Sequence, residues 1–583
     1  MEVSKKISEF AKNHEKALSI GFLVLFVAAV LMFRIDLFLA FLTDRGREFL
    51  FPSEILHGKV LYKDILCIYN PGAYLVNAFA MLLFGEKMSS VLAFATGSIF
   101  VTISFFYLLC REFFDNRTSI AFSVFIAVCS MFGGSLFNFV SPYSYSMTYG
   151  LMFSVVSTFL GVKFIKSGEG KFLYSANIFA GLAFAMKAEF LPLLPLLILS
   201  STVLKKCSFK TTALSTLSWF AAPVAAFGIL MLQGATVSDF LAAKNFLAAF
   251  ASTPSMATFY ANTGALPSKF GEECFFRGLF EFAVLAVVGY FLLKLKGKTP
   301  LFYALCAVAV FLPGFCGNDG AYLFFTWLPI ATALLLVLTA KKLFETDRPL
   351  LFLTLCALSL SIKTFFVLVF TKYGEYTIIL LLPAFTAVAA NFFDGSKFFK
   401  TVDFKRYMSF LAIIFTIFYS LFLYVRLSHA DTELKTDRGR ILTTRKTAAV
   451  TSELIDYIDA TTRNDDKLLV LPEGHMINFL TGRKIDTKLH MLDTLYYDAM
   501  GDEKAGELLR SADYDVIVTC EGFDFSHFGG NRFPHDIENS SVKKYLDKAY
   551  YLDKTIVSEL YKSKDNTWRN VFRCYRKKTA KTP

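Results

Sequence analysis

The chain has 583 residues and a net charge of +12 at pH 7; 55% of its residues are hydrophobic, 19% are charged and 67 are phenylalanine. Soluble domains are about a quarter charged, and no nucleic-acid-binding motif accounts for the positive charge. The composition therefore excludes an ordinary soluble domain and argues against nucleic acid as a partner. Apolar runs of about 18 or more residues recur and can cross a bilayer as helices, so we expect a polytopic α-helical membrane protein.

Thirteen transmembrane helices are predicted. The first, 17–39, is interpreted as a retained span because its apolar run lacks a cleavage site of small residues. The others are expected near 88–110, 118–135, 146–165, 172–187, 190–204, 212–232, 277–293, 300–314, 321–340, 349–370, 376–393 and 406–427. Residues 72–84 are also apolar, but this run is too short to span and is predicted to lie along the membrane surface.

Lysine and arginine are unevenly distributed between the loops. With the N-terminus inside, the inner loops carry about twice as many of them as the short outer loops, which satisfies the positive-inside rule. The rule is satisfied only if 72–84 is not a span. This topology makes the N-terminus cytoplasmic and places all residues after 427 outside. We expect the protein in the bacterial cytoplasmic (inner) membrane.

Two domains follow from this topology. Residues 1–427 form the transmembrane domain, with two long outer loops at 34–87 and 233–276. Residues 428–583 are richer in charge and are predicted to form a soluble extracytoplasmic α/β domain.

Within the second domain, "TAAVTSELIDYIDATT" (447–462) has helical periodicity, and "KLLVLPEG" (467–474) and "YDVIVTC" (514–520) indicate buried strands. The end of the chain, from "TIVSELYKS" to "NVFRCYRK", indicates a closing hairpin.

The first outer loop begins with an unusual cluster of charge. If 43–57 is helical, Asp44, Arg47 and Glu48 share one face. The carboxylate of Asp44 could take a proton from an acceptor, and an arginine could hold a lipid phosphate through two hydrogen bonds. The alternative is a surface helix with internal ion pairs worth about 0.2–0.5 kcal/mol each. The opposite face is apolar enough to lie on a membrane and consists of Phe49, Leu50, Ile55 and Leu56.

The same loop carries a resemblance to a known family. Its pattern is an acid just after the first span, then G-x-x-x-Y-x-D, a Pro-Gly pair and an apolar helix ending in "LLFG" (82–85). These elements are Asp44, Gly58, Tyr62, Asp64, Pro71 and Gly72. The stretch resembles the first outer loop of GT-C glycosyltransferases of the family 39 type, which includes protein O-mannosyltransferases and the aminoarabinose transferase of lipid A. Stretches 179–192, 372–385 and 470–484 are similar to other parts of that group.

The resemblance implies a GT-C-like transmembrane domain and a specific reaction. A sugar would move from a polyprenyl-phosphate carrier to a lipid, polysaccharide or protein acceptor on the outer face, with Asp44 as general base. The chain also departs from the family pattern. Arg45 stands where many members have a second acid, Asn70 replaces a basic residue before the proline, and the second outer loop (137–146) has no acid.

Further candidate residues lie at the outer ends of later spans. Lys187 would meet the carrier phosphate, or it would be a lysine whose charge reaches the interface from a helix end. Lys363 lies about mid-span, where an unpaired charge costs about 3 kcal/mol. The candidates for donor-phosphate or substrate binding are Arg47, Lys187, Glu189, Lys363, Tyr373 and Glu375, and the supporting residues of the first loop are Glu48, Tyr62, Asp64 and Tyr69.

No cofactor is predicted. Glu473 and His475 are too few for a metal site and are interpreted as a turn between a strand and a helix that caps the active site. A divalent metal stays unassigned, and no nucleotide-binding motif is present. The ten cysteines are scattered singly, which leaves disulfides open. A transporter or lipid flippase is the alternative function, and a non-catalytic assembly or sensor subunit is a third.

Overall fold

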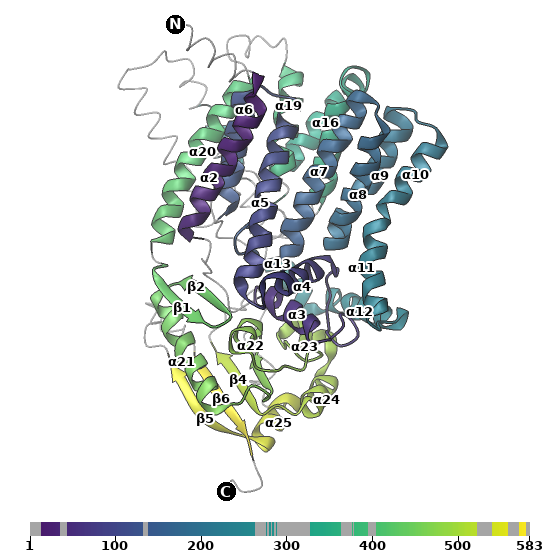
Figure 1. Ribbon diagram of the computed structural model, residues 1–583. Helices are drawn as coiled ribbons and strands as arrows, with labels where there is room; N and C mark the ends of the chain where they lie inside the picture. Colours follow the sequence, from purple (N-terminus) through teal and green to yellow (C-terminus); the bar gives the residue numbers. More distant parts are fainter. Residues whose placement is uncertain are drawn as a thin grey trace.

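The computed structural model describes residues 13–34, 44–131, 138–262, 327–362, 378–393, 404–428, 430–521, 539–557 and 571–578, with a few isolated positions between 276 and 287 and at 376. Apolar helices form a bundle at one end of the molecule, and an α/β domain lies at the other end (Figure 1).

The bundle contains most of the predicted spans. Its helices are α2 (Glu15–Arg34), α5 (Met88–Cys110), α6 (Asn116–Met131), α7 (Tyr145–Ser167), α8 (Gly170–Met186), α9 (Leu193–Leu199), α10 (Phe209–Trp219), α11 (Ala221–Leu232), α16 (Leu328–Thr346), α17 (Arg348–Leu360), α19 (Ile378–Phe393) and α20 (Phe404–Leu427). Among the described residues, four stretches are long and apolar enough to cross a membrane: Glu15–Met32, Met88–Cys110, Tyr145–Ser167 and Phe209–Leu232. The total of thirteen stays a prediction, since 277–293 and 300–314 fall largely or wholly outside the described residues.

Two predicted spans are not single regular helices. The stretch 190–204 is divided into a 3-10 turn (Ala188–Phe190), α9 and a π-helical turn (Ser200–Leu204). Pro192 and Pro195 lie at the start of α9, and proline has no N–H with which to continue a helix. The span expected at 212–232 is α10 followed by α11, which meet at Phe220.

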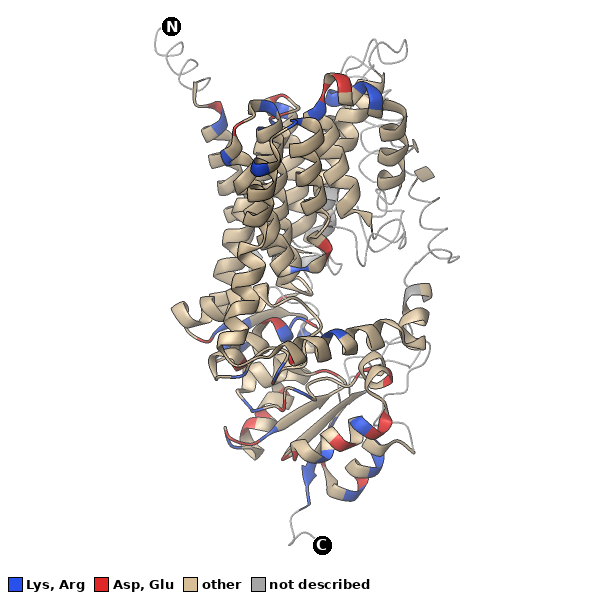
Figure 2. Ribbon diagram, turned by 90° about the vertical axis from the view of Figure 1, so that its right-hand side faces the viewer, with Lys and Arg blue, Asp and Glu red and all other residues tan. Residues whose placement is uncertain are grey.

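Figure 2 shows how charge is distributed along the molecule. Lysine and arginine gather at the end of the bundle remote from the α/β domain, and the helices between the two ends are almost free of charge. This is the distribution from which the topology was predicted.

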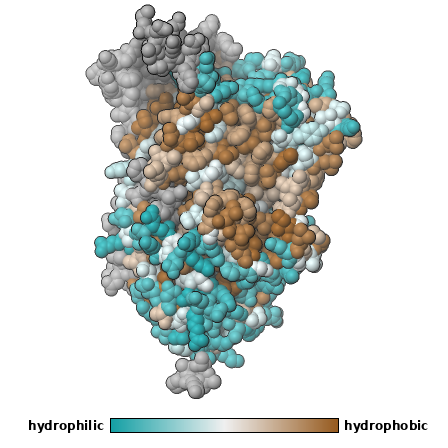
Figure 3. Space-filling model, viewed as in Figure 1, coloured by the Kyte–Doolittle hydropathy of each residue, from teal (hydrophilic) through white to brown (hydrophobic). Residues whose placement is uncertain are grey.

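The run 72–84 forms α4 (Gly72–Phe84), with the same bounds as predicted. Four of its apolar side chains remain 52–68% exposed: Phe79, Leu82, Leu83 and Phe84. They contribute to the apolar surface over α4 in Figure 3. An apolar face of this kind fits a helix lying along the membrane surface.

The prediction for the apolar face of the first-loop helix was wrong. The helix α3 (Arg47–Leu56) is shorter than 43–57, and Phe49, Leu50 and Ile55 are buried rather than spread on a membrane. Phe49 packs against Phe479 with ring centroids 5.6 Å apart. The α/β domain supplies this cover through α22 (His475–Thr481), and removing apolar surface from water stabilises the contact.

The α/β domain begins directly after α20. A hairpin of β1 (Thr432–Thr436) and β2 (Gly439–Thr443) leads into α21 (Arg445–Thr461). A sheet in the order β3-β4-β6-β5 follows, in which β3 (Leu468–Leu471) and β4 (Val516–Glu521) are parallel and the remaining pairs are antiparallel. The other elements are α23 (Thr494–Met500), α24 (Asp502–Ala512), α25 (Ser541–Ala549), β5 (Tyr550–Val557) and β6 (Val571–Lys577). The predicted helix, both strands and the closing hairpin are confirmed.

Both predicted outer loops contact the α/β domain. In the first loop, the Leu66 N–H donates to the Thr487 carbonyl at 3.1 Å, and the Thr487 hydroxyl donates to the Asp64 carbonyl at 2.7 Å. In the outer loop predicted at 233–276, α12 (Val237–Ala251) lies across the end of the bundle and packs against α23. The Tyr496 ring centroid is 5.3 Å from that of Phe250. The domain is therefore held from two sides.

Gly46 provides a test of this docking. A Cβ added at Gly46 would lie 2.1 Å from the backbone nitrogen of Met476 in α22, whereas a Cβ at Gly97 in α5 would meet nothing within 4 Å. We expect Gly46→Ala to cost about 1–3 kcal/mol because α3 and α22 must separate. Thermal unfolding of the purified protein in detergent measures this. Gly97→Ala is the matched control and should unfold at or above the wild-type temperature; equal behaviour of the two variants would contradict the docked arrangement.

Candidate active site

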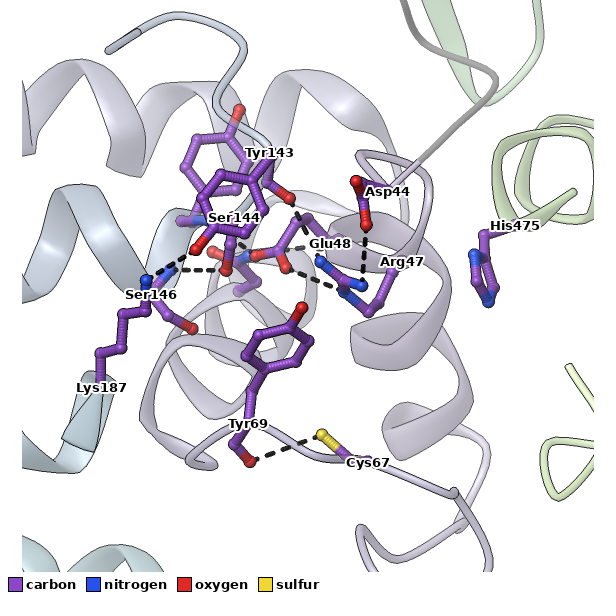
Figure 4. A network of polar contacts seen from close by, with 12 residues as sticks. Asp44, Arg47, Glu48, Cys67, Tyr69, Tyr143, Ser144, Ser146, Lys187 and His475 are labelled. Carbon is purple, nitrogen blue, oxygen red and sulfur yellow. Dashed lines mark hydrogen bonds and ion pairs between the residues drawn. The ribbon is translucent and has the colours of Figure 1, made fainter. Parts of the chain in front are cut away.

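Asp44 lies just before α3, at the junction between the bundle and the α/β domain (Figure 4). Its φ angle is 38°, a left-handed conformation that few residues other than glycine adopt. The side chain is 41% exposed, and its Oδ1 accepts a hydrogen bond from Arg47 Nη1 at 3.2 Å. Asp44 is thus an accessible carboxylate in a constrained position.

Arg47 is almost completely enclosed, with 2% of its surface exposed. Its Nη2 donates to the Tyr143 carbonyl at 3.3 Å, and its Nε lies 3.6 Å from Glu48 Oε1. The guanidinium also lies over the Tyr69 ring, 4.5 Å from the centroid. Arg47 is therefore a fixed cation that orients Asp44, and direct binding of a phosphate by Arg47 stays a prediction.

Glu48 anchors the loop from within. It is fully buried, and its Oε2 accepts a hydrogen bond from the Tyr145 N–H at 2.9 Å. Its carbonyl accepts from Asn77 Nδ2 at 3.2 Å, which ties α3 to α4. Burial raises the pKa of Glu48, while Arg47 and the Tyr145 N–H oppose that rise. The expected supporting role of Glu48 fits these contacts.

Lys187 approaches the same cluster from the end of α8. Its Nζ donates to the Tyr143 hydroxyl at 2.6 Å and lies 3.2 Å from Glu189 Oε2. The hydroxyl of Tyr376 donates to the same Glu189 carboxylate. Lys187 is 8% exposed, so it too is a largely buried cation.

Tyr143 contacts both Arg47 and Lys187, and it was not predicted from the sequence. Its carbonyl accepts from Arg47 and its hydroxyl accepts from Lys187. Figure 4 shows its ring between them. The second loop was discounted because it has no acid, although its two tyrosines next to serines were a signal for polar contacts.

The remaining predicted residues divide into two groups. Tyr62 donates from its hydroxyl to the Tyr69 carbonyl at 2.7 Å, and Asp64 Oδ2 accepts from the Val60 N–H at 2.9 Å. These contacts hold the loop in shape. Lys363, Tyr373 and Glu375 lie outside the described residues.

The α/β domain contributes a buried polar chain behind Asp44. His475 Nδ1 lies 3.0 Å from Glu473 Oε1, and His475 Nε2 lies 2.7 Å from His490 Nδ1. The carboxyl group of Glu473 also accepts a hydrogen bond from the Asp44 N–H. The predicted turn between a strand and a helix at Glu473 and His475 is confirmed. The sequence offered no signal that His490 contacts His475, because only the fold brings the two side chains together.

Burial controls the protonation of this chain. Burial and the nearby charge of Asp44 raise the pKa of Glu473 well above its usual range. Burial lowers the pKa of His475 to about 3, and it lowers the pKa of His490 well below its usual value. Burial, together with the nearby charge of Asp44, also raises the pKa of Asp493 to about 7. At neutral pH the two histidines are therefore uncharged.

Two further features bear on ligands. Within the described parts of the chain, no group of three or more His, Cys, Asp or Glu side chains is arranged to hold a metal ion.

A cavity of about 760 Å³ opens between α3 and the α/β domain, and its lining includes Lys59, Arg438 and Lys484. Each of these three cations forms an ion pair with a carboxylate.

No protein-family model matches the sequence, and no curated protein matches it. Among solved structures, the archaeal oligosaccharyltransferase AglB from Archaeoglobus fulgidus, in complex with an inhibitory peptide and a dolichol-phosphate, is 12% identical, with 98% of this chain and 75% of that chain covered and a TM-score of 0.48. ArnT from Cupriavidus metallidurans bound to undecaprenyl phosphate is 10% identical, with 95% and 98% covered and a TM-score of 0.42. These values describe a likeness of overall fold alone.

The buried pair of Arg47 and Glu48 can be tested by a double substitution. Arg47→Met leaves the Glu48 carboxylate buried without its cation, which should cost about 3–5 kcal/mol. Adding Glu48→Gln removes the stranded charge and keeps an acceptor for the Tyr145 N–H. The double variant should therefore unfold at a higher temperature than Arg47→Met alone. An additive loss in the double variant would show that the two side chains do not interact.

Asp493 makes stability depend on pH. Its Oδ1 accepts from the Tyr496 N–H at 2.8 Å. Because its pKa is higher in the folded state than the ordinary value, the folded state holds the proton between about pH 4 and pH 7, and stability falls as pH rises through that window. Asp493→Asn keeps the hydrogen bond and should unfold at a temperature that varies less over this window than that of the wild type. Parallel pH profiles of the two proteins would contradict the assignment.

Proposed function

We propose that this protein is a membrane glycosyltransferase that moves a sugar from a polyprenyl-phosphate carrier to a glycan, lipid or protein acceptor. The observation that carries the proposal is the meeting of the accessible carboxylate of Asp44 with two buried cations, Arg47 and Lys187, through Tyr143. A base and fixed positive charge are the two components that this transfer requires. The resemblance of residues 42–86 to family 39 loops supports the same reaction.

The site lies where the two substrates can meet. The apolar bundle and the exposed apolar face of α4 offer a lipid-facing surface, and the α/β domain offers a polar one. A carrier held in the bilayer would present its phosphate at this border, and an acceptor would approach from the aqueous side. We infer from the basic residues at the far end of the bundle (Figure 2) that the α/β domain lies outside the cytoplasmic membrane.

The proposed reaction is a single displacement. An acceptor hydroxyl oxygen attacks the anomeric carbon of the sugar and gives its proton to the Asp44 carboxylate. The bond between the anomeric carbon and the phosphate oxygen breaks, and the electron pair leaves with the polyprenyl phosphate. The positive charges of Arg47 and Lys187 stabilise the phosphate that forms. Arg47 also holds the Asp44 carboxylate in a fixed orientation through its hydrogen bond.

The test of this proposal compares three variants in cells that lack the native protein. Asp44→Asn should reduce the glycosylated product by about 100-fold or more, the usual size of a general-base effect, while the lipid-linked sugar accumulates. Lys187→Met should weaken binding of undecaprenyl phosphate to the purified protein. Glu54→Gln is the control, since Glu54 lies in the same helix but pairs with Lys59 at 2.6 Å.

Mass spectrometry of envelope glycans and of lipid-linked sugars provides both readouts. Full product formation by Asp44→Asn would overturn the proposal. If the lipid-linked sugar instead stays on the inner leaflet, a transporter or flippase would be the better assignment.

A further inference from the structure

The chain of polar groups behind Asp44 ends on a backbone carbonyl. Glu473 lies next to His475, His475 next to His490, and His490 Nε2 lies 2.8 Å from the Leu66 carbonyl in the first loop. The exposed fractions of Glu473, His475 and His490 are 8%, 0% and 2%. Water is therefore excluded, and the members of the chain must satisfy one another.

The terminal carbonyl determines where the protons lie. A carbonyl oxygen can only accept, so His490 Nε2 carries a hydrogen. In a neutral His490, Nδ1 is then an acceptor, and His475 Nε2 must donate to it. His475 Nδ1 becomes an acceptor in turn, and the group that donates to it is the carboxyl of Glu473. A neutral histidine pair therefore requires a protonated Glu473.

Two other arrangements contain the same number of protons, and in both of them Glu473 is a carboxylate that accepts from His475 Nδ1. The positive charge then lies either on His475, which also donates from Nε2 to His490, or on His490. Both arrangements place a negative charge on Glu473, close to Asp44, and a positive charge in the same enclosed region as Arg47. The titratable groups facing the chain are Asp44 and Arg47 from the first loop, Asp486 from the segment before His490, and Asp493 and Tyr496 from the segment after it. Separating charge in such a buried place is costly, so the neutral arrangement is favoured.

We propose that Glu473 is a positioning residue that works as a neutral carboxylic acid, bridging the Asp44 N–H to the histidine pair. This inference rests on the proposed function of Asp44. The Asp44 N–H donates to Glu473, and the Asp44 carbonyl accepts from the Arg47 N–H at 3.3 Å. The left-handed backbone of Asp44 is thus held from both sides.

The neutral state of Glu473 also has an electrostatic consequence. A second carboxylate beside Asp44 would repel the phosphate that leaves the carrier, and in a poorly solvated site such repulsion is stronger than in water. A carboxylic acid still accepts from the Asp44 N–H, and it donates to His475 Nδ1 without carrying a charge. The α/β domain therefore takes part in the site by fixing the base in place.

Glutamine is the decisive substitution. The amide of Glu473→Gln can accept from the Asp44 N–H and donate to His475 Nδ1, as the protonated acid does. We expect kcat of Glu473→Gln to stay within about threefold of wild type. Glu473→Leu, which is apolar and of similar size, should lower kcat by about tenfold or more with little change in KM, because Asp44 loses its orientation. The unfolding temperatures of both variants are measured alongside.

The pH profile separates positioning from a merely structural role. Wild-type activity should fall at high pH as Glu473 ionises, and this alkaline loss should be absent in Glu473→Gln. A folded Glu473→Gln as inactive as Glu473→Leu would overturn the inference and would indicate that Glu473 acts as a charged group. Asp44→Asn is assayed in parallel. If both Asp44→Asn and Glu473→Gln are inactive, only the inference about Glu473 is refuted. If Asp44→Asn is active, the proposed function itself is refuted.

A readout independent of activity is available from the histidines. The chain has only 7 histidines, so ¹⁵N-labelled histidine in the full-length protein in nanodiscs can be assigned with His475→Gln and His490→Gln variants. We expect both rings to be neutral, with the hydrogen on Nε2, from about pH 6 to pH 8. An imidazolium signal from either His475 or His490 would support a charge-separated arrangement and overturn the proposal.

Discussion

The buried guanidinium of Arg47 is the constraint on which the site depends. A cation that is 2% exposed is tolerated only when its hydrogens are matched by anions and carbonyls. Asp44 and the Tyr143 carbonyl accept hydrogen bonds from the guanidinium, the Glu48 carboxylate supplies a countercharge 3.6 Å from Nε, and the Tyr69 ring lies over one face. The charge of Arg47 therefore holds together the start of α3, the segment of Tyr69 and the segment of Tyr143. The hydrogen bond from Arg47 also fixes the orientation of Asp44.

The α/β domain has a more direct part in this arrangement than a separate soluble domain would have. Its helix α22 covers the apolar side of α3, and the strand before α22 ends in the turn that bears Glu473. Packing and polar contacts thus act on the two sides of the same short helix. A change in the docking of the domain would alter the position of Asp44, because the Asp44 N–H donates to Glu473 of that domain, while the Asp44 carbonyl accepts from the Arg47 N–H at the start of α3.

Much of the architecture could be predicted from local patterns. Hydrophobic runs predicted α5 and α4 at their observed bounds, and alternating strand and helix patterns predicted β3, β4 and α21. The apolar face of α3 was assigned to the membrane because a helix pattern shows that a face is apolar but not what covers it. Tyr143 and His490 were missed for a related reason: each contacts residues nearly one hundred or more than four hundred positions away.

The sequence by itself determined that the chain has apolar helices long enough to cross a membrane, where the polar segments between them fall, and that Asp44 is the acid to test. Hydropathy and charge act on each segment separately, so these features can be read without knowing its neighbours. Only the tertiary structure decided which polar groups meet in the interior. A buried charge must be satisfied by whatever side chains the fold brings to it, and for Asp44 these come from the first loop, the second loop and the α/β domain together.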